Sequence, residues 1–210
     1  MVETKTFALI MVIVVVSFLG FCVENIFISI NHGFIDNRNM MLPFLLGYGF
    51  AVLAYYILFG TPQKPLFFGN EISISSTFNS TAYCFVISFI GVCIGEILLG
   101  HLTEWCCDII WWDYSQIPMH ITRYTSVPTS FGFATLITIF MKYLFNPLLS
   151  TFSKINPTIL AILSTTLLLL LSLDMLNSAF YMLKNHNTLR IWRLDIDKIT
   201  HFMTRHTKLH

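Results

Sequence analysis

Carboxylates within apolar sequence are the residues of this 210-residue chain most able to do chemistry. Glu96 and Glu104 lie on either side of Gly100 at four-residue spacing, which places all three close to one face of a helix. Gly100 removes side-chain bulk, so another helix or a ligand can approach this face. Glu24 is a second carboxylate in an apolar segment. Because a carboxylate in a membrane span is costly, each is a candidate functional residue that needs a partner.

An aromatic and acidic run follows the segment that carries Glu96 and Glu104. It comprises Trp111, Trp112, Asp113, Tyr114 and Ser115. The aromatic residues fit a belt at the membrane–water boundary. Asp113 and Ser115 can hydrogen-bond to the backbone and form a turn. We therefore predict a well-fixed loop that caps the face carrying Glu96 and Glu104, with membrane anchoring as the simpler interpretation.

Two arginines, Arg38 and Arg123, are the candidate counter-groups, with Asn37 as a hydrogen-bond partner. In one interpretation these groups neutralise Glu24 or Glu96 and fix the helix register. In the other, the same groups line a polar pocket for a substrate head group or an ion. Residue types alone leave both open, and both predict that glutamates and arginines converge in space.

Asp174 also lies within an apolar segment and has no obvious partner nearby in the sequence. We expect it to pair across helices or to face a water-filled cavity.

The composition indicates an integral membrane protein. Hydrophobic residues make up 55% of the chain and charged residues only 11%, against roughly 25% charged in soluble domains. A net charge of +1 argues against a nucleic-acid partner. The sequence contains no CxxC, HExxH, GxSxG or GxxxxGK[ST] motif, so we expect no metal ion, P-loop nucleotide or other cofactor.

Five apolar segments are long enough to cross a membrane as helices. They predict an all-α, polytopic transmembrane bundle over residues 1–183. The tail, residues 184–210, has apolar residues at helical spacing and a net positive charge, which predicts a basic amphipathic helix on anionic membrane lipids. The predicted segments are Phe7–Ile30, Pro43–Gly60, Ala82–Leu102, Ser126–Phe145 and Pro157–Leu183.

The distribution of Lys and Arg predicts the orientation. With five spans and the C-terminus in the cytoplasm, eight of these residues lie inside and four outside. The N-terminus is then outside. The segments 31–42 and 104–124 share the cytoplasmic side.

A set of these residues resembles the ABC-transporter type IV, or CmpB-like, family of small bacterial multi-pass proteins. The resemblance covers roughly residues 17–147. One departure concerns residues 38–43, where this chain is one residue shorter than the family and lacks its glycines. The matching positions are Glu24, Asn37, Arg38, Pro43, Tyr48, Gly49, Glu96, Gly100, Trp111, Trp112, Asp113, Tyr114, Ser115, Arg123 and Pro128.

The resemblance implies a permease-type membrane subunit of a transport system that works with a separate ATPase or another partner. Glu24, Glu96 and Arg123 would line or brace a polar cavity, and the loop carrying Trp112 and Asp113 would gate it or dock the partner. Five spans are few for a complete pathway, so a partner or a homo-oligomer is expected. Two alternatives stay open: an enzyme acting on a lipid or isoprenoid head group, and a structural membrane protein without a substrate.

Overall fold

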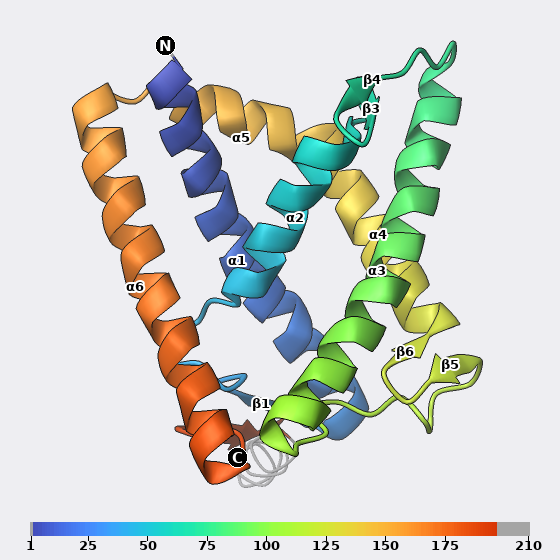
Figure 1. Ribbon diagram of the computed structural model, residues 1–210, viewed down its shortest axis with the longest axis vertical. Coiled ribbons are helices and arrows are strands. Elements are labelled where there is room, and N and C mark those ends of the chain that lie inside the picture. Colours follow the sequence, from blue (N-terminus) through green and yellow to red (C-terminus); the bar gives the residue numbers. More distant parts are fainter. Residues whose placement is uncertain (1, 197–210) are drawn as a thin grey trace, which may run out of the picture.

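The computed structural model describes residues 2–196 and shows a bundle of long helices (Figure 1). The predicted all-α membrane fold is confirmed. The elements are α1 (Val2–His32), α2 (Leu46–Phe59), α3 (Thr77–Cys107), α4 (Val127–Ile139), the π-helical turn η1 (Phe140–Leu144), α5 (Phe145–Phe152) and α6 (Pro157–Asn185).

Four helical stretches are long and apolar enough to cross a membrane. They are Thr4–His32, Thr77–Cys107, Val127–Phe152 and Pro157–Asn185. The second predicted span is a shorter apolar helix, α2, of 14 residues. At about 1.5 Å per residue, α2 is about 21 Å long, less than the roughly 30 Å of a hydrocarbon core.

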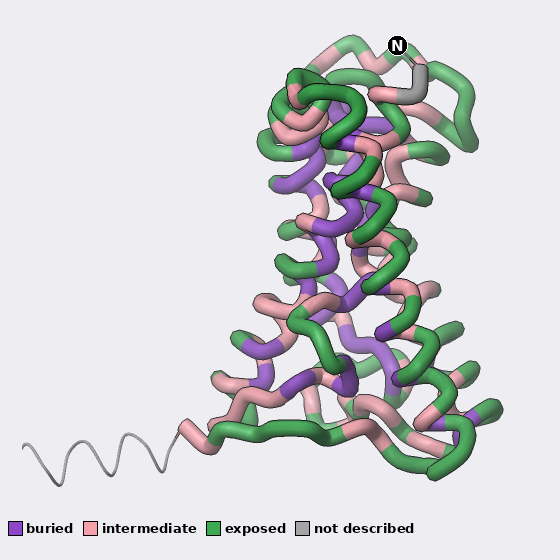
Figure 2. Tube along the Cα trace, turned by 90° about the vertical axis from the view of Figure 1, so that its left-hand side faces the viewer, coloured by how far each residue is buried: buried purple, intermediate pink, exposed green. Residues whose placement is uncertain are grey.

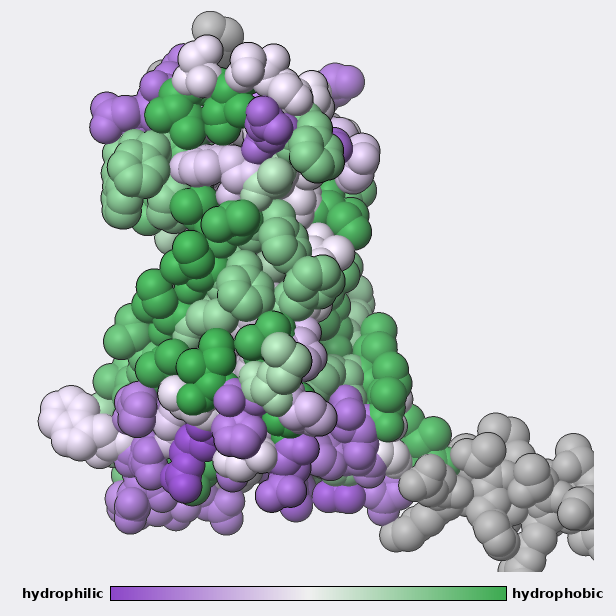
Figure 3. Space-filling view, turned by 90° about the vertical axis from the view of Figure 1, so that its right-hand side faces the viewer, coloured by the Kyte–Doolittle hydropathy of each residue, from purple (hydrophilic) through white to green (hydrophobic). Residues whose placement is uncertain are grey.

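The chain runs up and down between two ends of the bundle (Figure 1). The helix α1 descends from the N-terminus, α2 ascends, α3 descends, α4 ascends and α6 descends. The loops after α1, α3 and α6 therefore gather at the lower end. Figure 3 shows a broad apolar band above this polar lower end, as expected for a protein surrounded by lipid.

Local sequence accounts for the helix ends. Ser76, Ser126 and Asn156 are N-caps whose side chains accept backbone N–H groups of α3, α4 and α6. The helix α3 ends at Asp108, which adopts the left-handed conformation. It thus extends past the predicted end at Leu102 and includes Glu104.

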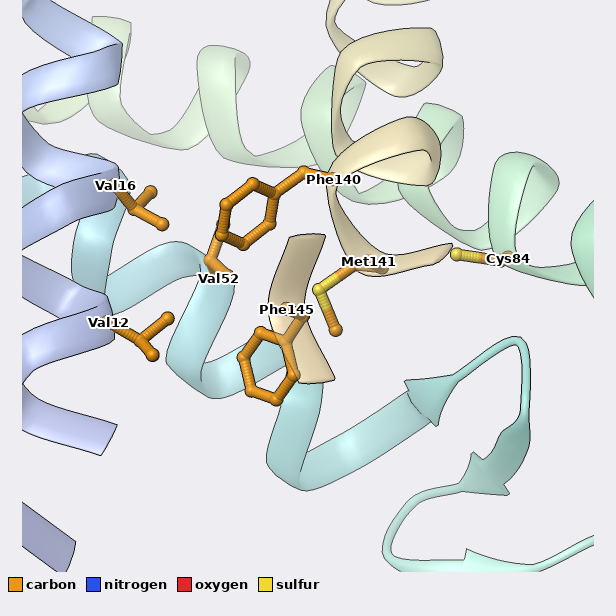
Figure 4. Close-up of a cluster of buried hydrophobic side chains, with 7 residues drawn as sticks. All are labelled: Val12, Val16, Val52, Cys84, Phe140, Met141 and Phe145. Carbon is orange, nitrogen blue, oxygen red and sulfur yellow. The ribbon is translucent and has the colours of Figure 1, made fainter. Parts of the chain in front are cut away.

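The helix α1 is the central element and α3 the most peripheral. Half of the most apolar window of α1 is buried, against 11% for α3. Figure 2 shows buried residues along the middle of the bundle. One core cluster joins α1, α2, α3, η1 and α5 (Figure 4), and it comprises Val12, Val16, Val52, Cys84, Phe140, Met141 and Phe145.

The π-helical turn η1 redirects the chain at the upper end. Below it, α4 packs on α3, and beyond it α5 crosses towards α1 and α6 (Figure 1). A π-turn inserts an extra residue into the helical ladder, which changes the direction of the helix axis.

Short antiparallel strands tie the loops together. In the upper loop, β2 (Gly60–Thr61), β3 (Lys64–Phe67) and β4 (Asn70–Glu71) form a three-stranded sheet. At the lower end, β5 (His120–Thr122) pairs with β6 (Thr125–Ser126). The strand β1 (Phe34–Asp36) pairs with β7 (Arg193–Asp195), with Ile35 opposite Leu194.

The first part of the tail differs from the predicted amphipathic helix. The helix α6 ends at Asn185, His186 is left-handed, and the chain then extends into β7. The reason is tertiary. The backbone of β1 forms hydrogen bonds with this segment when it is extended, whereas a surface helix would satisfy its own backbone groups. Residues 197–210, which carry most of the predicted helix, lie outside the described residues.

Candidate functional site

Glu24, near the lower end of α1, has two direct partners. Arg38 donates from Nη2 to Glu24 Oε2 at 2.8 Å, and the Tyr48 hydroxyl donates to Oε1 at 2.5 Å. The Arg38 and Glu24 side chains are only 16% and 22% exposed. A charge in such a place needs a counter-charge, and here the Glu24–Arg38 ion pair supplies it.

The turn that carries Arg38 is built from side-chain contacts in place of glycines. Arg38 and Asn39 both have positive φ angles, 48° and 66°. Asp36 stabilises the turn by accepting the Arg38 N–H at 2.8 Å, and Asn25 accepts the Asp36 N–H at 2.9 Å. Asparagine tolerates this backbone region, whereas arginine adopts it at a cost. The turn thus reaches its conformation without a glycine.

Two asparagines of this turn hold the segment after α6. Asn37 donates to the Leu189 carbonyl at 2.8 Å and accepts the Ile191 N–H at 3.0 Å. Asn39 accepts the Leu189 N–H at 2.5 Å and donates to Ser178 of α6. We call residues 187–196 the strap. Its backbone is bonded to the turn that positions Arg38.

Asp174 bonds to the backbone of the loop between α1 and α2, and so differs from both expected roles, pairing with another helix and facing a water-filled cavity. Its two carboxylate oxygens each accept one backbone N–H, from Met41 and from Leu42, at 2.9 Å. The Asp174 residue is 7% exposed. This carboxylate therefore ties α6 to the loop between α1 and α2.

Glu96, in α3, lies against the N-terminus of α4. Its Oε2 accepts the Thr125 hydroxyl at 2.6 Å and the Ser130 hydroxyl at 3.4 Å. The two hydroxyl oxygens are 2.9 Å apart, and both residues are fully buried. The partial positive charge of the α4 N-terminus also favours a carboxylate here. Among the described residues, no Lys or Arg forms an ion pair with Glu96.

Gly100 makes room for an aromatic ring of the protein itself. A Cβ atom at Gly100 would overlap the Tyr124 ring, which lies on this face of α3. The Tyr124 hydroxyl donates to Glu104, one turn further along, and Arg123 lies 3.4 Å from the same carboxylate. These Glu104 and Arg123 side chains are 40% and 45% exposed.

The same arrangement occurs on α1. A Cβ atom at Gly20 would approach the Tyr48 ring to 2.6 Å, and the Tyr48 hydroxyl reaches Glu24 four residues later. Each site is thus a Gly-x3-Glu segment covered by a tyrosine that hydrogen-bonds to the glutamate. Gly20, Tyr124 and the hydroxyls of Thr125 and Ser130 were not predicted from the sequence. The two Gly-x3-Glu segments were a signal that could have revealed the first two.

The loop after α3 is held by its own side chains. Trp112 donates from Nε1 to the Tyr124 carbonyl at 2.8 Å. Asp113 accepts the Ser115 N–H at 2.8 Å and the Ser115 hydroxyl at 2.5 Å, and these bonds lower the pKa of Asp113. Asp113 is exposed, so its carboxylate belongs to the turn and does not face Glu96.

Tyr114 connects the two sides of the lower end. Its ring lies 6.2 Å from the Phe27 ring of α1, and its N–H donates to the Arg123 carbonyl at 2.7 Å. Burial and the charges of Glu96 and Glu24 raise the pKa of Tyr114 well above its ordinary value, while Arg38 opposes this shift. The phenol therefore lies within electrostatic range of carboxylates from both α1 and α3.

A comparison with protein-family models identifies one match. The model described as "Putative ABC-transporter type IV" matches residues 11–179, most of the chain. This chain belongs to that family. Searches of curated proteins and of solved structures find no match.

The family match includes every candidate residue of the polar end and stops before the strap. Within it, the predicted convergence takes a specific form. Arg38 pairs with Glu24, Arg123 pairs with Glu104, and Glu96 is bonded by hydroxyls. We call Glu24, Arg38, Glu96, Tyr114 and Thr125 the polar cluster.

The two hollows that we describe lie away from the polar cluster. One is a narrow apolar gap between α1 and α2, and the other is a groove between α3 and α4. No residue of the polar cluster lines either. Within residues 2–196, no group of three or more His, Cys, Asp or Glu side chains is placed to hold a metal ion.

Proposed function

We propose that this chain is a membrane-embedded, permease-type subunit of a transport system that works with a separate ATPase. Membership of a family described as ABC-transporter type IV supports this proposal, as do four helices long enough to cross a membrane. The sequence contains no P-loop motif, so ATP hydrolysis would come from another chain.

The observation that carries the proposal is the state of Glu96. The neighbouring carboxylates Glu24 and Glu104 each have an arginine, whereas Glu96 is bonded only by hydroxyls and lies in a membrane-spanning helix. A carboxylate held by hydroxyl groups can gain or lose a proton or a cationic partner without breaking an ion pair. We infer that Glu96 is the group whose charge changes during transport.

The partner would dock at the lower end, where three loops meet (Figure 1). The loop after α3 is rigid there, because Trp112 and the Asp113–Ser115 turn fix it. A rigid loop joined to α3 can pass a displacement of the partner to Glu96 on the same helix. Membrane lipids surround the apolar band, and a second copy of the chain could complete the pathway.

The test is purification from native membranes in mild detergent, followed by mass spectrometry. A P-loop ATPase should co-purify, and Glu96→Gln should reduce its transport-linked ATP hydrolysis in liposomes while the complex stays intact. Glu104→Gln is the matched control on the same helix and should have little effect. A strictly monomeric protein without any associated chain would contradict the proposal.

A structural role without a substrate is the second candidate. The buried Glu24–Arg38 pair and the backbone contacts of Asp174 favour it, since both join elements of the bundle. In that case Glu96→Gln changes the melting temperature and leaves the ATPase activity of any associated protein unchanged. The same pair of variants thus distinguishes the two candidates.

A further inference from the structure

Polar contacts join the strap to the turn that carries Arg38. The side chains of Asn37 and Asn39 form three hydrogen bonds with the strap backbone, two at Leu189 and one at Ile191. No residue of the strap is buried. Hydrogen bonds rather than apolar burial therefore hold this segment, and segments held in this way open at a low cost in free energy.

Arg38 keeps its position at an energetic cost. Its φ angle of 48° is unfavourable for a residue with a Cβ atom. Its Nε–H is buried and finds no acceptor among the described residues, which adds to the cost. A strained conformation persists only when its surroundings fix it. Here the strap is part of those surroundings, because it is bonded to Asn37 and Asn39, the two chain neighbours of Arg38.

We propose that the strap is a releasable latch that holds Arg38 on Glu24. When the strap leaves, both neighbours of Arg38 lose the contacts that fix them. Arg38 then relaxes from the left-handed conformation and leaves the Glu24 carboxylate. Release therefore removes the counter-charge from one carboxylate of the polar cluster. The latch follows from the fold, and its effect on transport rests on the proposed function.

The first experiment weakens the strap without altering the turn. Leu189→Pro and Ile191→Pro each remove one backbone N–H that an asparagine accepts. The full chain in detergent is treated with phenylglyoxal, which modifies guanidinium groups, and mass spectrometry follows the reaction at Arg38. In both variants Arg38 should react about fivefold faster than in the wild type, the effect of losing one hydrogen bond.

Two controls accompany this measurement. Arg190→Pro places the same ring between the two positions, and within the described residues the Arg190 N–H forms no hydrogen bond. Arg38 should therefore react in this variant as it does in the wild type. Arg123, which pairs with Glu104, is the internal reference, and its reaction rate should be the same in every variant.

The second experiment uses the reciprocity of coupled contacts, which must stabilise each other by the same free energy. Glu24→Gln weakens the pair with Arg38 and leaves every residue of the strap in place. Amide hydrogen exchange over residues 187–196 should accelerate about fivefold, to match the first experiment. Glu104→Gln is the matched control, because it makes the same change in the ion pair with Arg123 and should leave exchange of the strap unchanged.

Circular dichroism and gel filtration verify that each variant folds. The proposal is overturned if the proline variants accelerate exchange of the strap while Arg38 reacts at the wild-type rate. It is also overturned if Glu24→Gln leaves exchange of the strap unchanged, a result that does not depend on the folding of a proline variant. Neither measurement uses ATP hydrolysis, so failure of the latch is distinguished from failure of the proposed transport function.

Discussion

At the scale of single residues, two glycines allow two tyrosines to reach the glutamates. Gly20 and Gly100 are buried, and each leaves space for a tyrosine ring to lie against its helix. The phenol then reaches a carboxylate one turn away, Glu24 in one case and Glu104 in the other. Because an added methyl group would overlap the ring, the role of these glycines is steric.

Substituting these glycines should therefore destabilise the protein. Gly100→Ala and Gly20→Ala should each cost about 1–3 kcal/mol, the usual penalty of overpacking. Gly91→Ala is the control on α3, since a Cβ atom there meets no neighbour within 4 Å, and alanine should stabilise the helix by about 0.5–1 kcal/mol. Thermal unfolding in detergent measures all three. Equal melting temperatures for Gly91→Ala and Gly100→Ala would refute this steric role.

At the scale of elements, the strap connects the end of the chain to the polar cluster. The N–H groups of Leu189 and Ile191 are bonded to Asn39 and Asn37, on either side of Arg38. The cation–π contact of Arg193 with Phe34, 3.7 Å from the ring centroid, adds a further contact to β1. The position of Arg38 thus depends on a segment far along the chain, since Asn39 and Leu189 are 150 residues apart.

Loss of one asparagine should loosen the strap measurably. In Asn37→Ala the Ile191 N–H loses its acceptor, and its hydrogen exchange should accelerate about fivefold, the equivalent of about 1 kcal/mol for one hydrogen bond. The control is Asn31→Ala, which removes an exposed side chain bonded only within α1. Hydrogen-exchange mass spectrometry over residues 187–196 reports both. Unchanged exchange in Asn37→Ala would show that β1–β7 pairing alone holds the strap.

At the scale of the whole molecule, the described helices place the N-terminal end of α1 and the end of α6 at opposite ends (Figure 1). Five Lys or Arg residues belong to the lower end and four to the upper end within residues 2–196. The remaining three basic residues follow residue 196. The predicted cytoplasmic placement of the lower end therefore depends largely on the tail.

Chemical labelling can test this orientation. A membrane-impermeant maleimide added to intact cells should label Lys154→Cys, at the upper end, and not the natural Cys106, which is exposed near the end of α3. Cys106 should react only after the membrane is opened, and Cys106→Ser removes that signal. Labelling of Cys106 alone in intact cells would reverse the orientation.

The sequence alone was sufficient to predict the fold class and the family. Long apolar runs must form helices in lipid. Carboxylates within these runs are candidate functional residues, because a charge in a membrane span is costly. The α2 helix is shorter than the predicted Pro43–Gly60 mainly at its start, since it begins at Leu46, and at its end Gly60 leaves the helix to pair in β2.

Only the tertiary structure decided which partner each charge has. Arg38 and Arg123 were both candidates for Glu24 and Glu96, and the fold pairs them with Glu24 and Glu104. That choice depends on where the loops return in space, which helical periodicity does not encode. It leaves Glu96 to two hydroxyls at the start of α4, because α4 begins beside α3 at that depth. The distinction between a paired and an unpaired glutamate is a property of packing, and it is what gives Glu96 its proposed role.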